Sequence, residues 1–136
     1  MDISVRIPKI LGVEDNKDSR EMMRALLQTS DNEYSITLVE TGAEALDLLA
    51  RMKFDLYILD IWLPGMDGVD LCRRIRDLGI TKPIVFFSAM VLPNDLEYGL
   101  AAGANEFLVK PRDIELLVNT VDRLLYNSDP ISTESG

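Results

Sequence analysis

The residues best suited to chemistry stand at the ends of short apolar stretches. An uninterrupted apolar run such as 56–59 is typical of a strand buried on both faces, as in a parallel sheet. Open α/β sheets bind their ligands at the carboxyl ends of such strands. Four of the runs end in polar groups: Glu14-Asp15, Asp60, Ser88 and Lys110. Since these runs are expected to form one parallel sheet, we expect the polar side chains to converge at one edge.

Carboxylates, a hydroxyl and an ammonium in one place indicate chemistry on phosphate. Crowded carboxylates repel each other, and their pKa values rise unless positive charge lies among them. Oxygen ligands in this number suit Mg²⁺, which prefers a few carboxylates and keeps several waters. Mg²⁺ and Lys110 would hold phosphoryl oxygens, and Ser88 would donate another hydrogen bond. Asp60 would then be a carboxylate nucleophile toward a phosphoryl group.

Each of these residues also has a purely structural interpretation. Asp60 and Ser88 are of types common in turns, acids such as Glu14-Asp15 favour helix N-termini, and lysines such as Lys110 mostly face solvent. The coincidence of these types at successive strand ends favours a site.

Strands and helices are expected to alternate five times. The apolar and β-prone runs predict strands at 10–13, 34–39, 55–60, 84–87 and 107–109. Apolar residues at helical spacing predict helices at 18–28, 42–52, 69–79, 92–103 and 114–125. Asp18 or Ser19 is the expected cap of the first helix, and Thr41 with Glu44 forms a capping box for the second. Such alternation requires an α/β fold with a parallel sheet covered by helices on both faces.

The charge pattern limits the classes of function. The chain carries 14 Lys and Arg against 23 Asp and Glu, a formal net charge of −9. Nucleic acid and anionic membranes require basic patches, so neither is expected as the main partner. The basic residues of the third predicted helix, Arg73, Arg74 and Arg76, are expected to face solvent. The chain has no histidine, which excludes histidine bases, nucleophiles and metal ligands.

Length and cysteine content predict one domain in a reducing compartment. The 136 residues suit a single domain, which we place at 9–126, after an N-terminal extension at 1–8 and before a flexible C-terminal tail at 127–136. The single Cys72 excludes an internal disulfide, and no run has the character of a signal peptide or a membrane span. We therefore expect a cytoplasmic protein.

The chain resembles the receiver domain of two-component response regulators, in particular the single-domain chemotaxis type. The resemblance covers about 9–126 and implies a flavodoxin-like sheet of five parallel strands in the order 2-1-3-4-5, with five helices. It rests on four motifs in combination: Val13-Glu14-Asp15-Asn16, Leu59-Asp60 with Leu63-Pro64-Gly65-Met66-Asp67-Gly68, Phe87-Ser88-Ala89, and Gly103-Ala104-Asn105-Glu106-Phe107 with Lys110-Pro111.

The resemblance implies a phosphorylation site that depends on Mg²⁺. Asp60 would accept a phosphoryl group from a phosphohistidine on a sensor histidine kinase or a histidine phosphotransfer protein. Asp15, Asp60 and the backbone carbonyl of Trp62 would bind Mg²⁺ directly, and Glu14 would act through water. The absence of histidine agrees with this, because the donor histidine must come from another protein.

The resemblance also implies a switch. Ser88 and Lys110 would contact the phosphoryl oxygens, and Phe107 would turn inward when Ser88 moves. A partner-binding surface would change as a result, and an unidentified downstream protein would respond. The protein would be a signalling switch and not an enzyme, since it would catalyse only its own phosphorylation and slow dephosphorylation.

Three further expectations follow from the resemblance. The Lys110-Pro111 peptide bond should be cis, although most bonds before proline are trans. The unphosphorylated protein should be a monomer. Trp62 and Met90 should flank the path of the water that hydrolyses the aspartyl phosphate, and because both are large and mostly apolar, that hydrolysis should be slow.

Other functions remain open at this point. The chain can be a receiver fragment of a hybrid histidine kinase or of a larger regulator, or an interaction module that ignores phosphorylation. A phosphatase of the haloacid-dehalogenase type would need a second acid where Trp62 stands. A flavin or dinucleotide site would need a glycine-rich loop in place of Glu14-Asp15-Asn16.

Overall fold

The computed structural model describes residues 6–89 and 92–126. Along this part of the chain, strands and helices alternate as β1 (Lys9–Val13), α1 (Lys17–Leu27), β2 (Ser35–Val39), α2 (Gly42–Leu49), β3 (Leu56–Leu59), α3 (Gly68–Asp77), β4 (Ile84–Ser88), α4 (Asp95–Ala101), β5 (Glu106–Val109) and α5 (Leu116–Tyr126). The strands are parallel in the order β2-β1-β3-β4-β5. The predicted flavodoxin-like architecture is confirmed.

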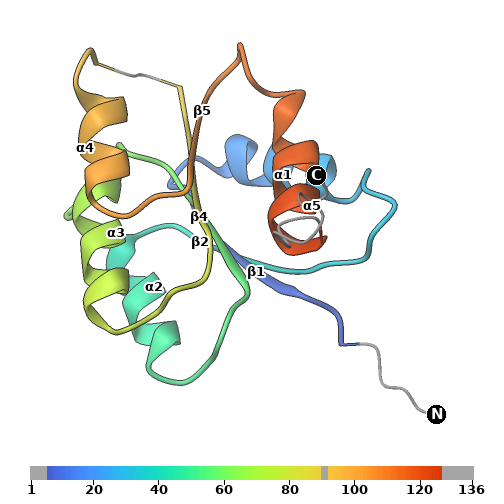
Figure 1. Ribbon diagram of the computed structural model, residues 1–136, viewed down its shortest axis with the longest axis horizontal. Helices are drawn as coiled ribbons and strands as arrows, with labels where there is room; N and C mark the ends of the chain where they lie inside the picture. The colour runs from blue at the N-terminus through green and yellow to red at the C-terminus, as the bar shows by residue number, and fades with distance from the viewer. Residues whose placement is uncertain (1–5, 90–91, 127–136) are drawn as a thin grey trace, which may run out of the picture.

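Side chains that alternate along each strand build one apolar layer on each face of the sheet. In β3, Tyr57 and Leu59 belong to the layer under α2 and α3, whereas Leu56 and Ile58 belong to the layer under α1 and α5. Figure 1 shows α1 and α5 on one side of the sheet and α2, α3 and α4 on the other. Because helices cover both faces, the central strand contains no charged residue.

The first helix is capped differently from the prediction. Asn16 and not Asp18 or Ser19 is the N-cap: its backbone is extended, and its Oδ1 accepts a hydrogen bond from the backbone N–H of Ser19 at 2.9 Å. The helix therefore begins at Lys17, and Ser19 already lies in the first turn as a donor. The predicted capping box of α2 is confirmed, since Thr41 and Glu44 each accept from the other's backbone N–H.

Two features around the last strand bear on the predictions. The Lys110-Pro111 peptide bond is cis, as expected. The last helix begins at Leu116 and not at the predicted 114, because the backbone turns through 111–115. In this turn, Asp113 accepts a hydrogen bond from the backbone N–H of Val109 through its carboxylate at 2.9 Å.

The helix predicted at 92–103 is present as α4, but its small residues and not its leucines face the sheet. Asp95 and Gly99 are its buried residues. A Cβ on Gly99 would lie 3.0 Å from the ring of Phe86 and 3.1 Å from that of Phe107, so these rings occupy the space that a larger side chain would need. Three leucines at helical spacing lie in solvent instead: Leu92, Leu96 and Leu100, which are 53%, 49% and 46% exposed.

The three arginines of α3 are predicted to face solvent, and for Arg76 this prediction is wrong. Its guanidinium donates to the carbonyls of Gly103 (2.7 Å), Ile80 (2.9 Å) and Lys82 (2.7 Å), and to Oδ1 of Asn105 (3.0 Å). These contacts tie α3 to the loop before β4 and to the turn before β5. Arginine suits this position because its rigid fork carries five donors.

The carboxylate of Asp55 binds the chain segment before β1 to the start of the central strand. Asp55 precedes β3 and is buried, and its oxygens accept from Arg6 at 2.7 and 3.1 Å and from the backbone N–H of Lys9 at 2.8 Å. The hydrogen bonds from Arg6 hold the pKa of Asp55 below its usual value, against the opposite effect of burial. The chain before β1 is thereby fixed to the central strand.

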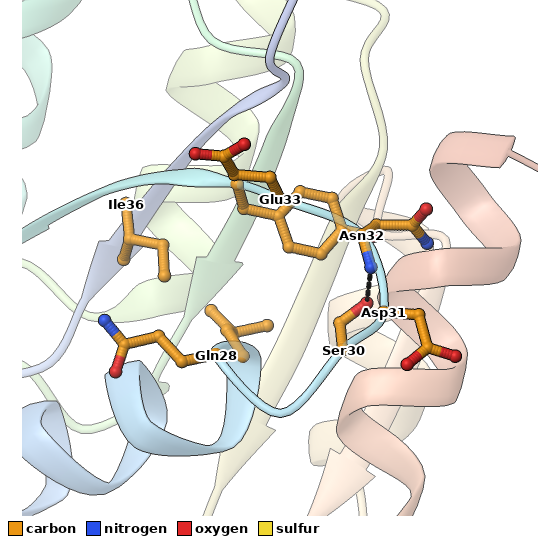
Figure 2. A pocket seen from close by; sticks show the side chains of 8 residues that line it. Gln28, Ser30, Asp31, Asn32, Glu33 and Ile36 are labelled. Carbon is orange, nitrogen blue, oxygen red and sulfur yellow. Dashed lines mark hydrogen bonds between the residues drawn. The ribbon is translucent and has the colours of Figure 1, made fainter.

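A polar concavity of about 400 Å³ lies where α1 ends and β2 begins, at the edge of the sheet where the strands start (Figure 2). Ser30 organises it: its hydroxyl accepts from the backbone N–H of Asn32 at 2.9 Å and donates to Asp122 of α5 at 2.8 Å. The hydroxyl of Tyr34 also donates to Asp122. The concavity contains none of the predicted site residues.

In the part of the chain described, no helix has the length and apolar character of a membrane span.

We expect Arg76→Lys to lower the free energy of unfolding by about 1–2 kcal/mol, because one ammonium cannot replace the fork and partly buried carbonyls lose their donors. Urea denaturation measures this. Arg73→Lys is the matched control on the same helix, and as an exposed substitution it should change stability by less than about 0.5 kcal/mol. Equal effects of the two substitutions would contradict the assigned role of Arg76.

We expect Asp55→Asn to lower the free energy of unfolding at pH 7 by about 1–2 kcal/mol. The folded-state pKa of Asp55 is depressed, so its contribution is present above the unfolded-state pKa and is lost as pH falls through the lower folded-state value. The difference between wild type and variant should therefore narrow below about pH 4. Denaturation curves between pH 7 and pH 3 test this, with the exposed Asp31→Asn as control. A difference independent of pH would contradict it.

Candidate functional site

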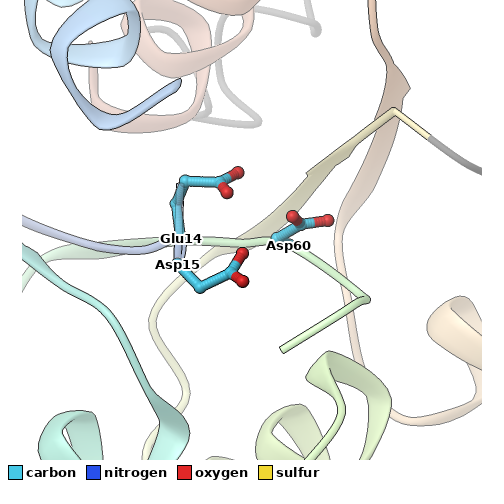
Figure 3. A group of neighbouring side chains, drawn as sticks. All are labelled: Glu14, Asp15 and Asp60. Carbon is cyan, nitrogen blue, oxygen red and sulfur yellow. The ribbon is translucent and has the colours of Figure 1, made fainter. Parts of the chain in front are cut away.

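Three acidic side chains meet at the edge where the strands end (Figure 3). Glu14 and Asp15 follow β1 and Asp60 follows β3, and these strands are hydrogen-bonded neighbours. One carboxylate oxygen from each residue lies within 4.8 Å of the others. Glu14 and Asp60 are buried and Asp15 is exposed, so the group opens to solvent on the side of Asp15. The predicted convergence of the acids is confirmed.

The carboxylate of Asp60 is held through one of its two oxygens. Its Oδ1 accepts from the hydroxyl of Ser88 at 2.5 Å, from the backbone N–H of Ile61 at 2.7 Å and from that of Trp62 at 3.4 Å. No donor to Oδ2 is found within residues 6–89 and 92–126. One oxygen is therefore fixed, and the other is available to a ligand.

The loop after Asp60 folds back onto the residue it follows. A Cβ on Gly68 would lie 1.9 Å from the carbonyl oxygen of Asp60, so only glycine fits there. The N–H of Gly68 donates to the carbonyl of Ile61 at 2.8 Å. Asp67 then caps α3 by accepting from the backbone N–H of Asp70 at 2.8 Å. These contacts explain the glycine-rich break that follows the central strand.

Lys110 brings the positive charge to the acidic edge. It follows β5, is buried, and donates from Nζ to Oε1 of Glu14 at 3.1 Å. The same Nζ lies 5.2 Å from the centre of the Phe87 ring, a cation–π contact that holds the ammonium. The backbone N–H of Lys110 donates to the carbonyl of Ser88 at 2.9 Å. The site thus joins the ends of β1, β3, β4 and β5.

The carboxyl group of Glu14 is under opposing influences. Burial raises its pKa, and the negative charge of Asp60 acts in the same direction. The backbone N–H of Asn16, 3.0 Å from Oε2, and the ammonium of Lys110 lower that pKa, but the net direction is upward. Further positive charge among the acids would favour the ionised form.

The sequence analysis did not foresee a part for Arg20 at this edge. Its Nη1 donates to the carbonyls of Glu14 at 2.9 Å and Asp15 at 3.0 Å, and its Nη2 pairs with Glu40 at 3.4 Å. The arginine therefore fixes the backbone that carries two of the three acids. No signal in the sequence distinguishes Arg20 from an ordinary arginine on a helix surface.

Two of the predicted residues lie around the acidic group and not within it. Phe107 is half-buried, and its ring packs on Phe86 with 5.4 Å between ring centres. Trp62 is 45% exposed and, with Asp95 and Tyr98, lines a groove of about 290 Å³ between the loop after β3 and α4. Met90 lies outside the described residues.

Comparisons with known proteins agree with this arrangement. The family model described as the response regulator receiver domain matches residues 10–122. The response regulator MprA of Mycobacterium sp. (strain KMS) is 38% identical over 122 residues, and MprA of Mycobacterium leprae (strain TN) is 37% identical. Both matches cover 90% of this chain but only 52% and 53% of the relatives, so the chain spans about half their length.

Solved structures show the same likeness. The chemotaxis response regulator CheY4 of Vibrio cholerae superposes with a TM-score of 0.78 at 30% identity, covering 88% of this chain and 100% of that one. The receiver domain of a signal transduction histidine kinase from Syntrophus aciditrophicus gives 0.77 at 33% identity, covering 88% and 91%. With the family model matching most of its length, the chain belongs to the response regulator receiver domain family of two-component signalling.

Proposed function

We propose that this receiver domain accepts a phosphoryl group on Asp60 from a phosphohistidine of a partner protein. The observation that carries the proposal is the state of the Asp60 carboxylate. It is buried at the meeting point of four strand ends, with Oδ1 fixed by Ser88 and by two backbone N–H groups. A carboxylate held in this way presents its second oxygen in a defined direction.

The transfer would proceed by attack of Oδ2 of Asp60 on phosphorus. The bond between phosphorus and oxygen forms while the bond between phosphorus and the imidazole nitrogen of the donor breaks. The electron pair of the broken bond stays on the imidazole, which takes up a proton. The product is an aspartyl phosphate. Because the phosphorylated histidine belongs to the donor protein, the lack of histidine in this chain presents no obstacle.

The donor set suits Mg²⁺, which we include in the proposal. Three carboxylates with oxygens within 4.8 Å of one another form a cluster of hard oxygen ligands that repel each other without a cation. Asp15, Asp60 and the backbone carbonyl of Trp62 would hold the ion, with Glu14 acting through water. Once bound, Mg²⁺ supplies positive charge beside the transferring phosphoryl oxygens.

The remaining residues would stabilise the phosphoryl group and change conformation when it is present. Lys110, already buried beside the acids, would contact the phosphoryl oxygens, and Ser88 would donate to them after it leaves Oδ1 of Asp60. Phe107, which packs on Phe86 next to Gly99 of α4, would turn inward as Ser88 moves. A sensor histidine kinase or phosphotransfer protein would be the donor, and a downstream protein would read the changed surface. A monomeric unphosphorylated state stays a prediction.

We expect Asp60→Asn to abolish phosphorylation. The chain is incubated with acetyl phosphate and Mg²⁺, and the intact mass is measured with and without a chelator. Wild type should gain the mass of one phosphoryl group only when Mg²⁺ is present. Asp77→Asn, an exposed change at the end of α3, is the matched control and should be modified like wild type. Modification that survives in Asp60→Asn, or that ignores the chelator, would refute the proposal.

We expect Trp62→Asn to shorten the lifetime of the phosphorylated form. The backbone N–H of Trp62 donates to Oδ1 of Asp60, and a smaller polar side chain at this position would admit and orient the attacking water. A gain of about 1.4 kcal/mol in transition-state stabilisation would speed hydrolysis about tenfold. The decay of the phosphorylated mass is followed over time, with Tyr98→Asn on the far side of the same groove as control. If the Trp62 variant decays at the wild-type rate or more slowly, the tryptophan does not shield the site. Met90→Glu extends the same test to the second predicted residue.

A further inference from the structure

An apolar groove lies at the end of the sheet opposite the acidic site. It has a volume of about 390 Å³ and is formed where α2 and α3 end, beside the start of β3. We call it the α2–α3 groove; its apolar walls are Leu49, Met52, Phe54, Leu78 and Ile80. Figure 1 shows the ends of α2 and α3, which pack together, at the lower edge of the molecule. A volume of this size accommodates a small organic ligand.

A buried donor lines this groove. Tyr57 of β3 is 1% exposed. Its hydroxyl oxygen is hydrogen-bonded to the backbone of Phe54, but within the part of the chain that the structure describes no acceptor for the hydroxyl proton is found. Burial, and to a lesser degree the charge of Asp55, raises the pKa of Tyr57, so the hydroxyl is protonated at neutral pH. A buried O–H without an acceptor is unfavourable, and a ligand that supplies one removes that penalty.

The rim of the groove is positively charged, although the chain as a whole carries −9. Lys53 and Lys82 both line it and are exposed. Asp55 lies 4.0 Å from Lys82, but its carboxylate is already paired with Arg6 at 2.7 Å. Arg76 adds positive charge behind the wall. An anion is therefore favoured at the mouth.

The wall of the groove is fixed before any ligand binds. Arg76 donates to the carbonyls of Ile80 and Lys82, and so holds the loop that separates α3 from β4. A preformed wall reduces the loss of conformational freedom when a ligand is bound.

We propose that the α2–α3 groove binds a small amphipathic carboxylate of the medium-chain fatty acid type. The hydrocarbon chain packs against the apolar walls. The carboxylate accepts a hydrogen bond from the hydroxyl of Tyr57 and pairs with Lys53 and Lys82 at the rim. The site is separate from Asp60, so binding requires neither phosphorylation nor Mg²⁺.

The two lysines also follow helix C-termini, where positive charge stabilises a helix. Replacement of the lysines distinguishes this structural role from ligand binding, because the two roles affect different measured quantities. Replacing the lysines would shift the melting temperature in the first case, and the dissociation constant of a carboxylate in the second.

The test is a calorimetric titration of the full chain with decanoate. We expect one saturable site with a dissociation constant below about 1 mM, and at least tenfold weaker binding of decanol and of decyltrimethylammonium. Tyr57→Phe, which removes only the hydroxyl, and the double variant Lys53→Gln with Lys82→Gln should each weaken decanoate binding at least tenfold. Lys17→Gln, on α1, is the control for charge. Asp60→Asn should bind like wild type, so failure of the phosphorylation proposal leaves this one intact.

Amide chemical shifts of the wild type give a readout that does not depend on any variant folding. Decanoate should move the amides of Lys53, Tyr57 and 78–82. Absence of saturable binding, equal binding of decanol, shifts confined to other regions, or variants that bind like wild type would each overturn the proposal.

Discussion

The structure depends on how one ammonium is placed among three carboxylates. Lys110 reaches Glu14 at 3.1 Å from the far side of two strands, and both side chains are nearly excluded from water. Buried acids without such a partner would be costly, and removing one member of a buried pair is strongly destabilising. Parallel pairing of β1, β3, β4 and β5 is what brings these groups together, so the fold and the charge balance of the site are inseparable.

The sheet and its acidic edge were predictable because short stretches of the sequence are sufficient to indicate them. The runs around Ile58 and Phe86 have no charged residue, and this indicates strands covered on both faces. Once the strands are parallel, their ends must share an edge, and Glu14, Asp15 and Asp60 must converge. The capping box at Thr41 was equally visible, since it needs only two residues at a fixed spacing.

What the sequence could not reveal were contacts between segments far apart in the chain. Arg20 and Arg76 look like surface arginines, but each binds backbone carbonyls of neighbouring loops. Nothing local in the sequence marks a carbonyl as the partner of a distant guanidinium. The cap at Asn16 was missed for a related reason. Three nearby residues, Asn16, Asp18 and Ser19, have side chains suited to capping, and only the backbone conformation selects one of them.

The orientation of α4 was also beyond the sequence pattern, and it has an energetic consequence. The helix turns Gly99 and Asp95 to the sheet and its leucines to solvent, and its N-cap residue Asn94 makes no side-chain capping bond. The helix itself therefore contributes few apolar side chains to the core. Segments with few buried apolar contacts open at the low end of a protein's range of local unfolding free energies. In this molecule we accordingly expect α4 to open more readily than α3 or α5, and its amide hydrogens should exchange with solvent ahead of theirs.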